Sequence, residues 1–378
     1  MRTPTEAHAA LTALAEGHPH PALVTGTATT TGTRPVYLYP GQGSHHPGTG
    51  RHLYQTFPAY AQAIDDLTDA FRPHLDHPLR DLLHAEPDTP TAALLNHTHY
   101  AQPAIFALGT ALTHLLTHHD IHPTAVLGHS IGALTAAHTA GILTLHDAAT
   151  LVTTRARLMQ QTPHTGTMTA IQATPEEALH AITGHEHLVS LAAVNSPTSI
   201  VLSGDHHTLT HITDHFHTQG RRTKPLTVSH AFHSPHMDPI LDEFHTAARE
   251  ITFHEPKIPF ISDATGKPAG PEVTTPQYWT DHIRGTVRYH DALQTAAQLG
   301  TTTYLELGAT PTLTAPTRET LDTAHITPLL RPDTDETHHL LTALATTWTT
   351  GTPLTHTTTH TNHTPLPTYP FQHQHLWL

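Results

Sequence analysis

The 378-residue chain contains no cysteine, which excludes disulfide bonds, thiolate metal sites and a cysteine nucleophile. It has no run of roughly 18 apolar residues, so we expect no membrane span. Residues 1–30 lack the basic start and apolar stretch of a signal peptide, and we expect a soluble, cytoplasmic protein. Only 17 residues are Lys or Arg, and the net charge of -14 argues against a nucleic-acid partner, because phosphate contacts need clustered basic side chains.

Histidine, by contrast, occurs 42 times in a chain that is also crowded with threonine. The histidines are spread along the sequence and do not gather into a ligand set such as His-Glu-x-x-His. Arg-to-His and Ala-to-Thr are each a single G-to-A codon change, so drift in base composition accounts for both excesses. We therefore place most histidines on solvated faces and predict neither a metal site nor a cofactor.

Strands, tight turns and helices alternate over residues 34–165 and 229–330, which predicts a parallel α/β core of the hydrolase-like kind. Short buried strands are expected at residues 35–40 and 125–127. Each of these strands runs directly into a glycine-rich turn, where the backbone can reverse sharply.

Residues 166–228 change this rhythm and follow a strand–helix–strand–strand–helix–strand order. The expected elements lie at residues 167–172, 175–182, 189–195, 200–203, 208–218 and 224–228. This order is typical of a ferredoxin-like unit, so we predict a small subdomain inserted into the α/β core. We interpret the polar residues 1–33 and 331–378 as linkers that precede and follow the catalytic unit.

Between the second expected strand and an Ala-rich helix lies the motif Gly128-His129-Ser130-Ile131-Gly132. A Gly-x-Ser-x-Gly turn in this context holds the serine hydroxyl clear of its neighbours, and the amide after it can donate to an oxyanion. An ordinary strand-to-helix turn is the alternative interpretation of the same five residues. The motif makes Ser130 the candidate nucleophile.

A second glycine-rich segment, Pro40-Gly41-Gln42-Gly43-Ser44, follows the first strand. It lacks the Gly-Lys-Ser/Thr ending of a phosphate loop, so we favour a backbone amide that approaches an acyl oxygen. A nucleophilic serine also needs a base, and composition cannot choose among so many histidines. Position favours the loop at residues 230–235, where the chain returns from the inserted unit to the core and can face a cleft.

Together these segments resemble the malonyl-CoA:acyl carrier protein transacylases, specifically the acyltransferase domains of modular type I polyketide synthases. Further segments that carry the resemblance are 155–160, 278–279, 287–289, 305–308 and 366–372. The resemblance implies that a malonyl group passes from malonyl-CoA to the phosphopantetheine thiol of an acyl carrier protein through a malonyl-serine ester. It also implies the ketosynthase of the same module as a partner.

In this family pattern Ser130 is the nucleophile, and His233 is its general base and later the acid for the departing thiol. The backbone amides of Gln42 and Ile131 correspond to the oxyanion hole. Arg155, which follows the serine by 25 residues, matches the arginine that holds the free malonyl carboxylate.

His129 is expected to line the same pocket, and His282 stands where the family has an Asn or Gln whose backbone carbonyl supports the base. Two further positions depart from the family pattern, Ala133 in place of Glu and His45 in place of Gln. The loss of a carboxylate at Ala133 could change pocket electrostatics or partner docking.

Three segments resemble the malonyl-selecting subgroup of the family. They are Ile131 after the serine, the loop that contains His230 and Phe232, and the segment with Tyr100 and Gln102. The methylmalonyl-selecting subgroup typically has Gln after the serine and a Tyr-Ala-Ser-His loop, so the resemblance predicts malonyl as substrate.

Two other functions fit some of these residues. A serine hydrolase such as a thioesterase shares the serine turn but needs an acid to orient its base, for which Asp205, Asp238 and Asp263 are candidates. A scaffold domain whose site has decayed is the second alternative, and the retention of Ser130 and His233 argues against it.

Overall fold

The computed structural model describes residues 3–28, 32, 34–163 and 165–354. The segment 366–372 and parts of both predicted linkers lie outside the described residues. No helix among the described residues is long and apolar enough to cross a membrane. The same residues contain no group of three or more His, Asp or Glu side chains that could hold a metal ion.

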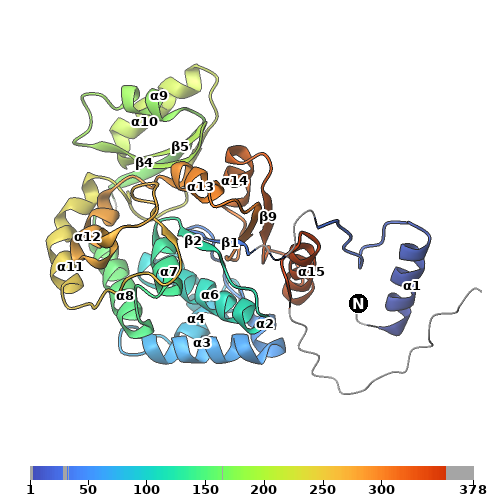
Figure 1. Ribbon diagram of the computed structural model, residues 1–378. Helices are drawn as coiled ribbons and strands as arrows, with labels where there is room; N and C mark the ends of the chain where they lie inside the picture. The colour runs from blue at the N-terminus through green and yellow to red at the C-terminus, as the bar shows by residue number, and fades with distance from the viewer. Residues whose placement is uncertain (1–2, 29–31, 33, 164, 355–378) are drawn as a thin grey trace, which may run out of the picture.

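A five-stranded parallel sheet forms the centre of the larger subdomain, with the strand order β7-β2-β1-β8-β9 (Figure 1). Its strands are β1 (Val36–Tyr39), β2 (Ala125–Gly128), β7 (Phe260–Ile261), β8 (Thr303–Glu306) and β9 (His325–Pro328). Every residue of β1 and β2 is buried, as expected for central strands of a parallel sheet that is covered on both faces. Both strands end in the two glycine-rich turns.

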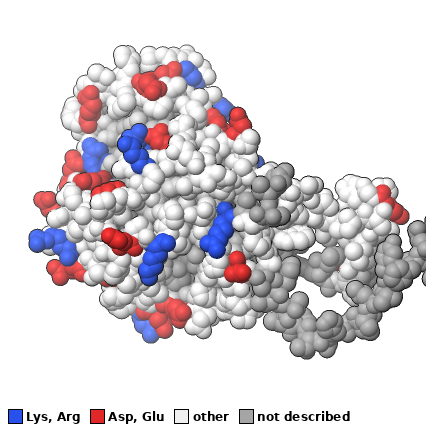
Figure 2. All heavy atoms as spheres, viewed as in Figure 1, with Lys and Arg blue, Asp and Glu red and all other residues white. Residues whose placement is uncertain are grey.

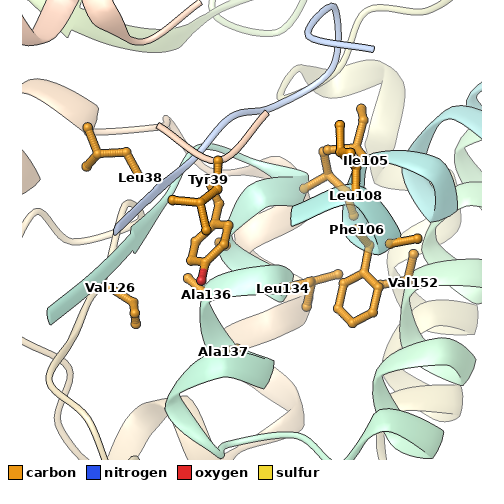
Figure 3. Packing of buried hydrophobic residues seen from close by; sticks show 14 of the residues in the cluster. Leu38, Tyr39, Ile105, Phe106, Leu108, Val126, Leu134, Ala136, Ala137 and Val152 are labelled. Carbon is orange, nitrogen blue, oxygen red and sulfur yellow. The ribbon is translucent and has the colours of Figure 1, made fainter. Parts of the chain in front are cut away.

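Helices enclose this sheet and supply most of the core. The main ones are α3 (Pro58–Phe71), α6 (Thr98–His118), α7 (Ile131–Ala140) and α8 (Leu145–Gln161). In Figure 3, the Phe106 ring of α6 lies beside Leu134 of α7 and Val152 of α8. Phe106 is fully buried, and burial of such a side chain contributes about 1.5–3 kcal/mol. This packing fixes α7 and α8, which carry the site, against the sheet.

The remaining helices of the larger subdomain are short. They are α2 (Arg51–Thr56), α4 (Leu79–Leu83), α5 (Pro90–Leu94), α11 (Leu241–Ala248), α12 (Pro276–Arg284), α13 (Tyr289–Ala297) and α14 (Thr314–Thr320). Two 3₁₀ turns occupy Pro235–Ile240 and Pro271–Thr274. Of the predicted linkers, the first contains α1 (Pro4–Ala15) and the second α15 (Glu336–Thr349). The Glu336 carboxylate accepts hydrogen bonds from the amides of Gly50 and His52, which anchors α15 on α2.

The smaller subdomain is a four-stranded antiparallel sheet with the order β4-β5-β3-β6. Its elements are β3 (Gly166–Ile171), α9 (Pro175–Ala181), β4 (Val189–Ser196), β5 (Ser199–Asp205), α10 (His206–Thr218) and β6 (Thr223–Pro225). Helices α9 and α10 cover its outer face, and the sheet stands above the parallel one (Figure 1). The predicted α/β fold with a ferredoxin-like insertion is confirmed, whereas the exact domain boundaries stay a prediction.

One strand is shorter than expected, because β6 ends at Pro225 rather than at residue 228. Pro225 has no N–H to donate, but the N–H of Leu226 still donates to the carbonyl oxygen of Met168 in β3 at 2.9 Å. The following residues, 226–228, instead line a cavity that opens toward Ser130. On the face seen in Figure 2, acidic and basic side chains are interspersed and widely spaced.

Candidate active site

Ser130 lies at the turn between β2 and α7, with φ of 54° and ψ of -116°. A non-glycine residue rarely adopts a positive φ, and such strain at a strand-to-helix turn is typical of a nucleophile elbow. Glycine is required on both sides of it. A Cβ added to Gly132 would overlap the carbonyl oxygen of Tyr39, and one added to Gly128 would overlap the backbone of Ala133.

The Ser130 hydroxyl donates to His233, with 2.7 Å between Oγ and Nε2. The other ring nitrogen, Nδ1, donates to the carbonyl oxygen of Gly285 at 2.8 Å. Since Nδ1 must carry the proton to donate to a carbonyl, Nε2 is left to accept the serine proton. Burial and then the charge of Arg155 lower the pKa of His233 well below its usual value, so the ring is neutral and able to act as a base.

The prediction that the carbonyl of His282 supports this base is wrong, because that role belongs to Gly285. Helix α12 ends at Arg284, and Gly285 follows it with extended backbone angles. Its carbonyl can therefore point out of the helix toward His233, whereas residue 282 lies within the helix. The His282 ring is buried, and its Nε2 donates instead to Asp263 at 3.0 Å.

Arg155 reaches the site from α8 and is only 3% exposed. Its Nη2 donates to Ser130 Oγ at 3.2 Å, and its Nη1 donates to Gln102 Oε1 at 2.6 Å. Burial lowers the pKa of Arg155 to about 10, and the nearby charge of Asp263 opposes this shift. The guanidinium is therefore cationic at neutral pH. No carboxylate oxygen among the described residues lies within 4.0 Å of it.

The two residues whose amides are predicted to form the oxyanion hole, Gln42 and Ile131, both line the same cavity as Ser130. The N–H groups of Gln42 and Ile131 donate to no other backbone group among the described residues. Gly41 permits this close approach of loop and elbow, because a Cβ there would lie 2.9 Å from the carbonyl oxygen of His129. Two such N–H groups beside a serine can stabilise a developing negative charge.

The remaining predicted pocket residues separate into two groups. His129 and Phe232 line the cavity, and His129 Nε2 donates to Asn195 Oδ1 of β4 at 2.9 Å. His230 is buried behind Phe232, with ring centroids 5.8 Å apart. Tyr100 does not face the cavity, and its hydroxyl donates to an aspartate, Asp76, at 2.6 Å.

Gln102 also lies outside the cavity lining but holds Arg155 in place, and it is itself held by Thr98. The cavity has a volume of about 400 Å³ and lies between the two subdomains. Its walls come from the elbow, the glycine-rich loop, the small sheet and α14. Cavities at the junction of two subdomains are common ligand-binding sites.

Sequence reasoning missed the role of Asp263, which it considered only as a possible triad acid. Its carboxylate accepts the backbone N–H of Ser130 at 2.8 Å and does not contact His233. Asp263 follows β7, the neighbour of β2, and side chains after adjacent parallel strands meet at one edge of the sheet. That placement was the available signal, but it required the strand order to be known.

A strand–serine–helix turn, a histidine on the hydroxyl and a cavity between two subdomains define an α/β protein built around a serine–histidine pair. The family described as acyl transferase domain matches residues 36–353. The chain belongs to this family, in the form found in type I polyketide synthases.

Curated relatives include the spectinabilin polyketide synthase system protein NorB of Streptomyces orinoci, with 43% identity over 96% of this chain. The mycoketide-CoA synthase of Mycobacterium tuberculosis is 40% identical over 94% of the chain. The chain spans 17% and 8% of the lengths of these two relatives, respectively.

Solved structures agree with this assignment. The acyltransferase domain from the second module of the salinomycin polyketide synthase matches with a TM-score of 0.89 and 38% identity, covering 94% of this chain and 82% of that one. The malonyl-CoA:acyl carrier protein transacylase of Xanthomonas oryzae pv. oryzae matches with a TM-score of 0.73 and 26% identity, covering 80% and 96% respectively.

Proposed function

We propose that this domain loads a malonyl group from malonyl-CoA onto Ser130 and passes it to the phosphopantetheine thiol of an acyl carrier protein. One observation carries the proposal. The Ser130 hydroxyl lies 2.7 Å from a neutral imidazole nitrogen of His233 and 3.2 Å from a buried guanidinium nitrogen of Arg155. A base and an unpaired cation thus meet at one nucleophile, which suits an acyl donor that carries a free carboxylate.

In the first half-reaction, Ser130 Oγ bonds to the thioester carbonyl carbon while His233 Nε2 takes the hydroxyl proton. The negative charge that develops on the carbonyl oxygen is stabilised by the amides of Gln42 and Ile131. The carbon–sulfur bond then breaks, and the imidazolium returns its proton to the coenzyme A thiolate. The second half-reaction reverses these steps, with the carrier-protein thiol as the attacking group.

Arg155 supports this choice of acyl group because a buried cation without a carboxylate partner is costly. A malonyl carboxylate would pair with it in a charge-assisted geometry, although the present partners Ser130 and Gln102 occupy two of its N–H groups. The acetyl group has no such carboxylate. We therefore expect malonyl to be preferred over acetyl.

Phe232 supports selection against a branched donor, because it lines the cavity beside the nucleophile and is 6% exposed. A ring in this place fills the space that an α-methyl group would need. Exclusion of one methyl group is worth only about 1–3 kcal/mol, so we expect discrimination of roughly 10- to 200-fold.

A thioesterase would use the same serine but is disfavoured by the partner of the base. His233 Nδ1 meets a carbonyl oxygen, whereas a hydrolase triad places a carboxylate there. The proposed ketosynthase and carrier-protein partners are inferred from the type of module to which the family belongs.

The experiment that tests the proposal is intact-protein mass spectrometry after incubation with malonyl-, methylmalonyl- and acetyl-CoA. We expect a malonyl adduct on Ser130, absent in Ser130→Ala, which carrier protein removes faster than water does. Rapid loss of the adduct without a carrier protein would favour the thioesterase. A wild-type domain that takes no acyl group would favour the decayed scaffold.

A further inference from the structure

Asp263 is a completely buried carboxylate that contacts both sides of the active site. Its Oδ2 accepts the backbone N–H of Ser130 at 2.8 Å, and its Oδ1 accepts a hydrogen bond from His282 Nε2 at 3.0 Å. Its own backbone carbonyl oxygen accepts the N–H of Arg288 at 2.6 Å. One residue therefore joins the nucleophile turn to two points on the segment 282–288.

That segment is the one that orients the base. Helix α12 carries His282 and is followed at once by Gly285, whose carbonyl oxygen holds His233 Nδ1. Ser130 and His233 are 103 residues apart in sequence, so their alignment depends on contacts between distant segments. Asp263 supplies such a contact on the nucleophile side and the base side together.

The contact of Asp263 with the backbone of Ser130 is important for the shape of the nucleophile turn. Ser130 holds a positive φ that an L-residue adopts only when its surroundings enforce it. The acceptor for its N–H is a carboxylate from the segment after β7 rather than a group of its own turn. Without that acceptor the N–H would be buried and unpaired, and the turn could relax away from its strained form.

We propose that Asp263, held by His282, is a positioning residue that fixes the backbone of Ser130 and so aligns Oγ with His233 Nε2. The proposal rests on the function proposed above, since it concerns the same nucleophile. It assigns the effect to a hydrogen-bond acceptor at a fixed place, not to a negative charge.

Three variants separate these possibilities. Asp263→Asn keeps an acceptor for the Ser130 N–H and offers its amide to His282 in the other ring tautomer, but it removes the charge. Asp263→Leu removes both charge and acceptor but places a larger side chain in a buried position, and Asp263→Ala removes both without overpacking. Asp238→Asn serves as control, because Asp238 forms an ion pair with Arg284 of α12, the helix that also carries His282, but its side chain is 56% exposed.

The readouts are the maximal rate and the KM of malonyl loading, the melting temperature, and labelling of Ser130 by an organophosphonate that esterifies reactive serines. For the Leu and Ala variants we expect the maximal rate to fall about 10- to 100-fold with KM changed by less than about 3-fold. The Asn variant and the Asp238→Asn control should stay within about 5-fold of wild type.

An Asn variant as slow as Leu would overturn the proposal in favour of a charge effect. Leu or Ala variants with a lower melting temperature but a wild-type maximal rate would show that Asp263 is merely structural. The organophosphonate distinguishes these failures from failure of the proposed function. If wild type takes no malonyl group, the same order of labelling rates, with Asn near wild type and Leu and Ala slower, still tests the positioning role.

Discussion

At the scale of single residues, the site depends on how side chains from distant segments meet at Ser130. Sequence motifs were sufficient to nominate Ser130, His233 and Arg155, and the structure brings the three together. They could be nominated because each lies in a local pattern of glycines, spacing or loop position. The roles of Gly285 and Asp263 could not be predicted in this way. Gly285 acts through its backbone carbonyl, which any residue type has, and the contact of Asp263 with Ser130 depends on the order of strands in the sheet.

Arg155→Ala should lose malonyl transfer while keeping or gaining acetyl transfer. Hydrogen bonds to a charged group contribute roughly 1.5–3 kcal/mol, so the malonyl-to-acetyl ratio should fall about 10- to 150-fold. Competition between the two donors, followed by mass spectrometry, measures this ratio. Arg157→Ala is the matched control, because Arg157 lies on the same helix but forms a surface ion pair with Glu243. Equal losses on both donors would identify Arg155 as a structural arginine.

Phe232→Ser should narrow the preference for malonyl over methylmalonyl, mainly by raising methylmalonyl transfer. The smaller side chain leaves room for the branching methyl in the cavity. The measurement is the ratio of kcat/KM values for the two donors, and the double variant with His230→Tyr should narrow it further. If the ratio is unchanged in both variants, selection lies elsewhere, with Ile131 the next residue to test.

At the scale of elements, the strand–turn–helix unit of β2 and α7 determines where the nucleophile stands. The glycines on either side of Ser130 are there because backbone atoms of neighbouring segments leave no room for a Cβ. The antiparallel insertion was predictable from its order of strands and helices, as both lie in short periodic segments. The end of β6 at Pro225 was harder to predict, because Leu226 and Val228 continue the alternating apolar pattern of a strand beyond it.

Gly132→Ala should abolish or strongly reduce loading of Ser130, because the new methyl overlaps the Tyr39 carbonyl and forces the turn to move. We expect a loss of stability of about 1–3 kcal/mol from overpacking. Gly184→Ala provides the comparison, since Gly184 has φ of 84° but no atom within 4 Å of an added Cβ. Gly184→Ala should lose only the stability that backbone strain costs, with acylation of Ser130 unchanged. Urea denaturation measures the loss of stability in both variants, and acylation assays measure the loss of activity. Full activity in Gly132→Ala would contradict the described turn.

At the scale of the whole molecule, the abundance of histidine has a consequence that composition alone did not indicate. We expected most histidines on solvated faces, yet several are buried in the core or beside it. Burial lowers the pKa of His45, His129, His138 and His233, and it lowers that of His84 to about 4. Tertiary packing determines which histidines are buried, and the residues next to each histidine in the sequence do not predict it.

Stability should therefore fall as pH drops below about 6.5, the usual histidine pKa in an unfolded chain. Below that pH the unfolded state binds more protons than the folded state, whose buried histidines stay neutral until their lower pKa values are reached. Melting temperatures between pH 8 and pH 5 measure the effect, at roughly constant ionic strength. His84→Gln should flatten the pH dependence, and His187→Gln, at an exposed position, should not. A melting temperature that is independent of pH over this range would contradict the explanation.

The junction between the two sheets bears directly on domain exchange. Val287 forms a parallel bridge with Ala193 of β4, two residues beyond the carbonyl that orients the base. Thr286 donates its hydroxyl to the Leu191 carbonyl of the same strand at 2.6 Å. The small subdomain is thus joined edge to edge with the segment that holds His233. A graft of residues 166–228 from a related synthase would replace β4 but not the residues that it contacts in the larger subdomain. Exchange of substrate preference by this route therefore requires residues 285–287 to be replaced together with the small subdomain.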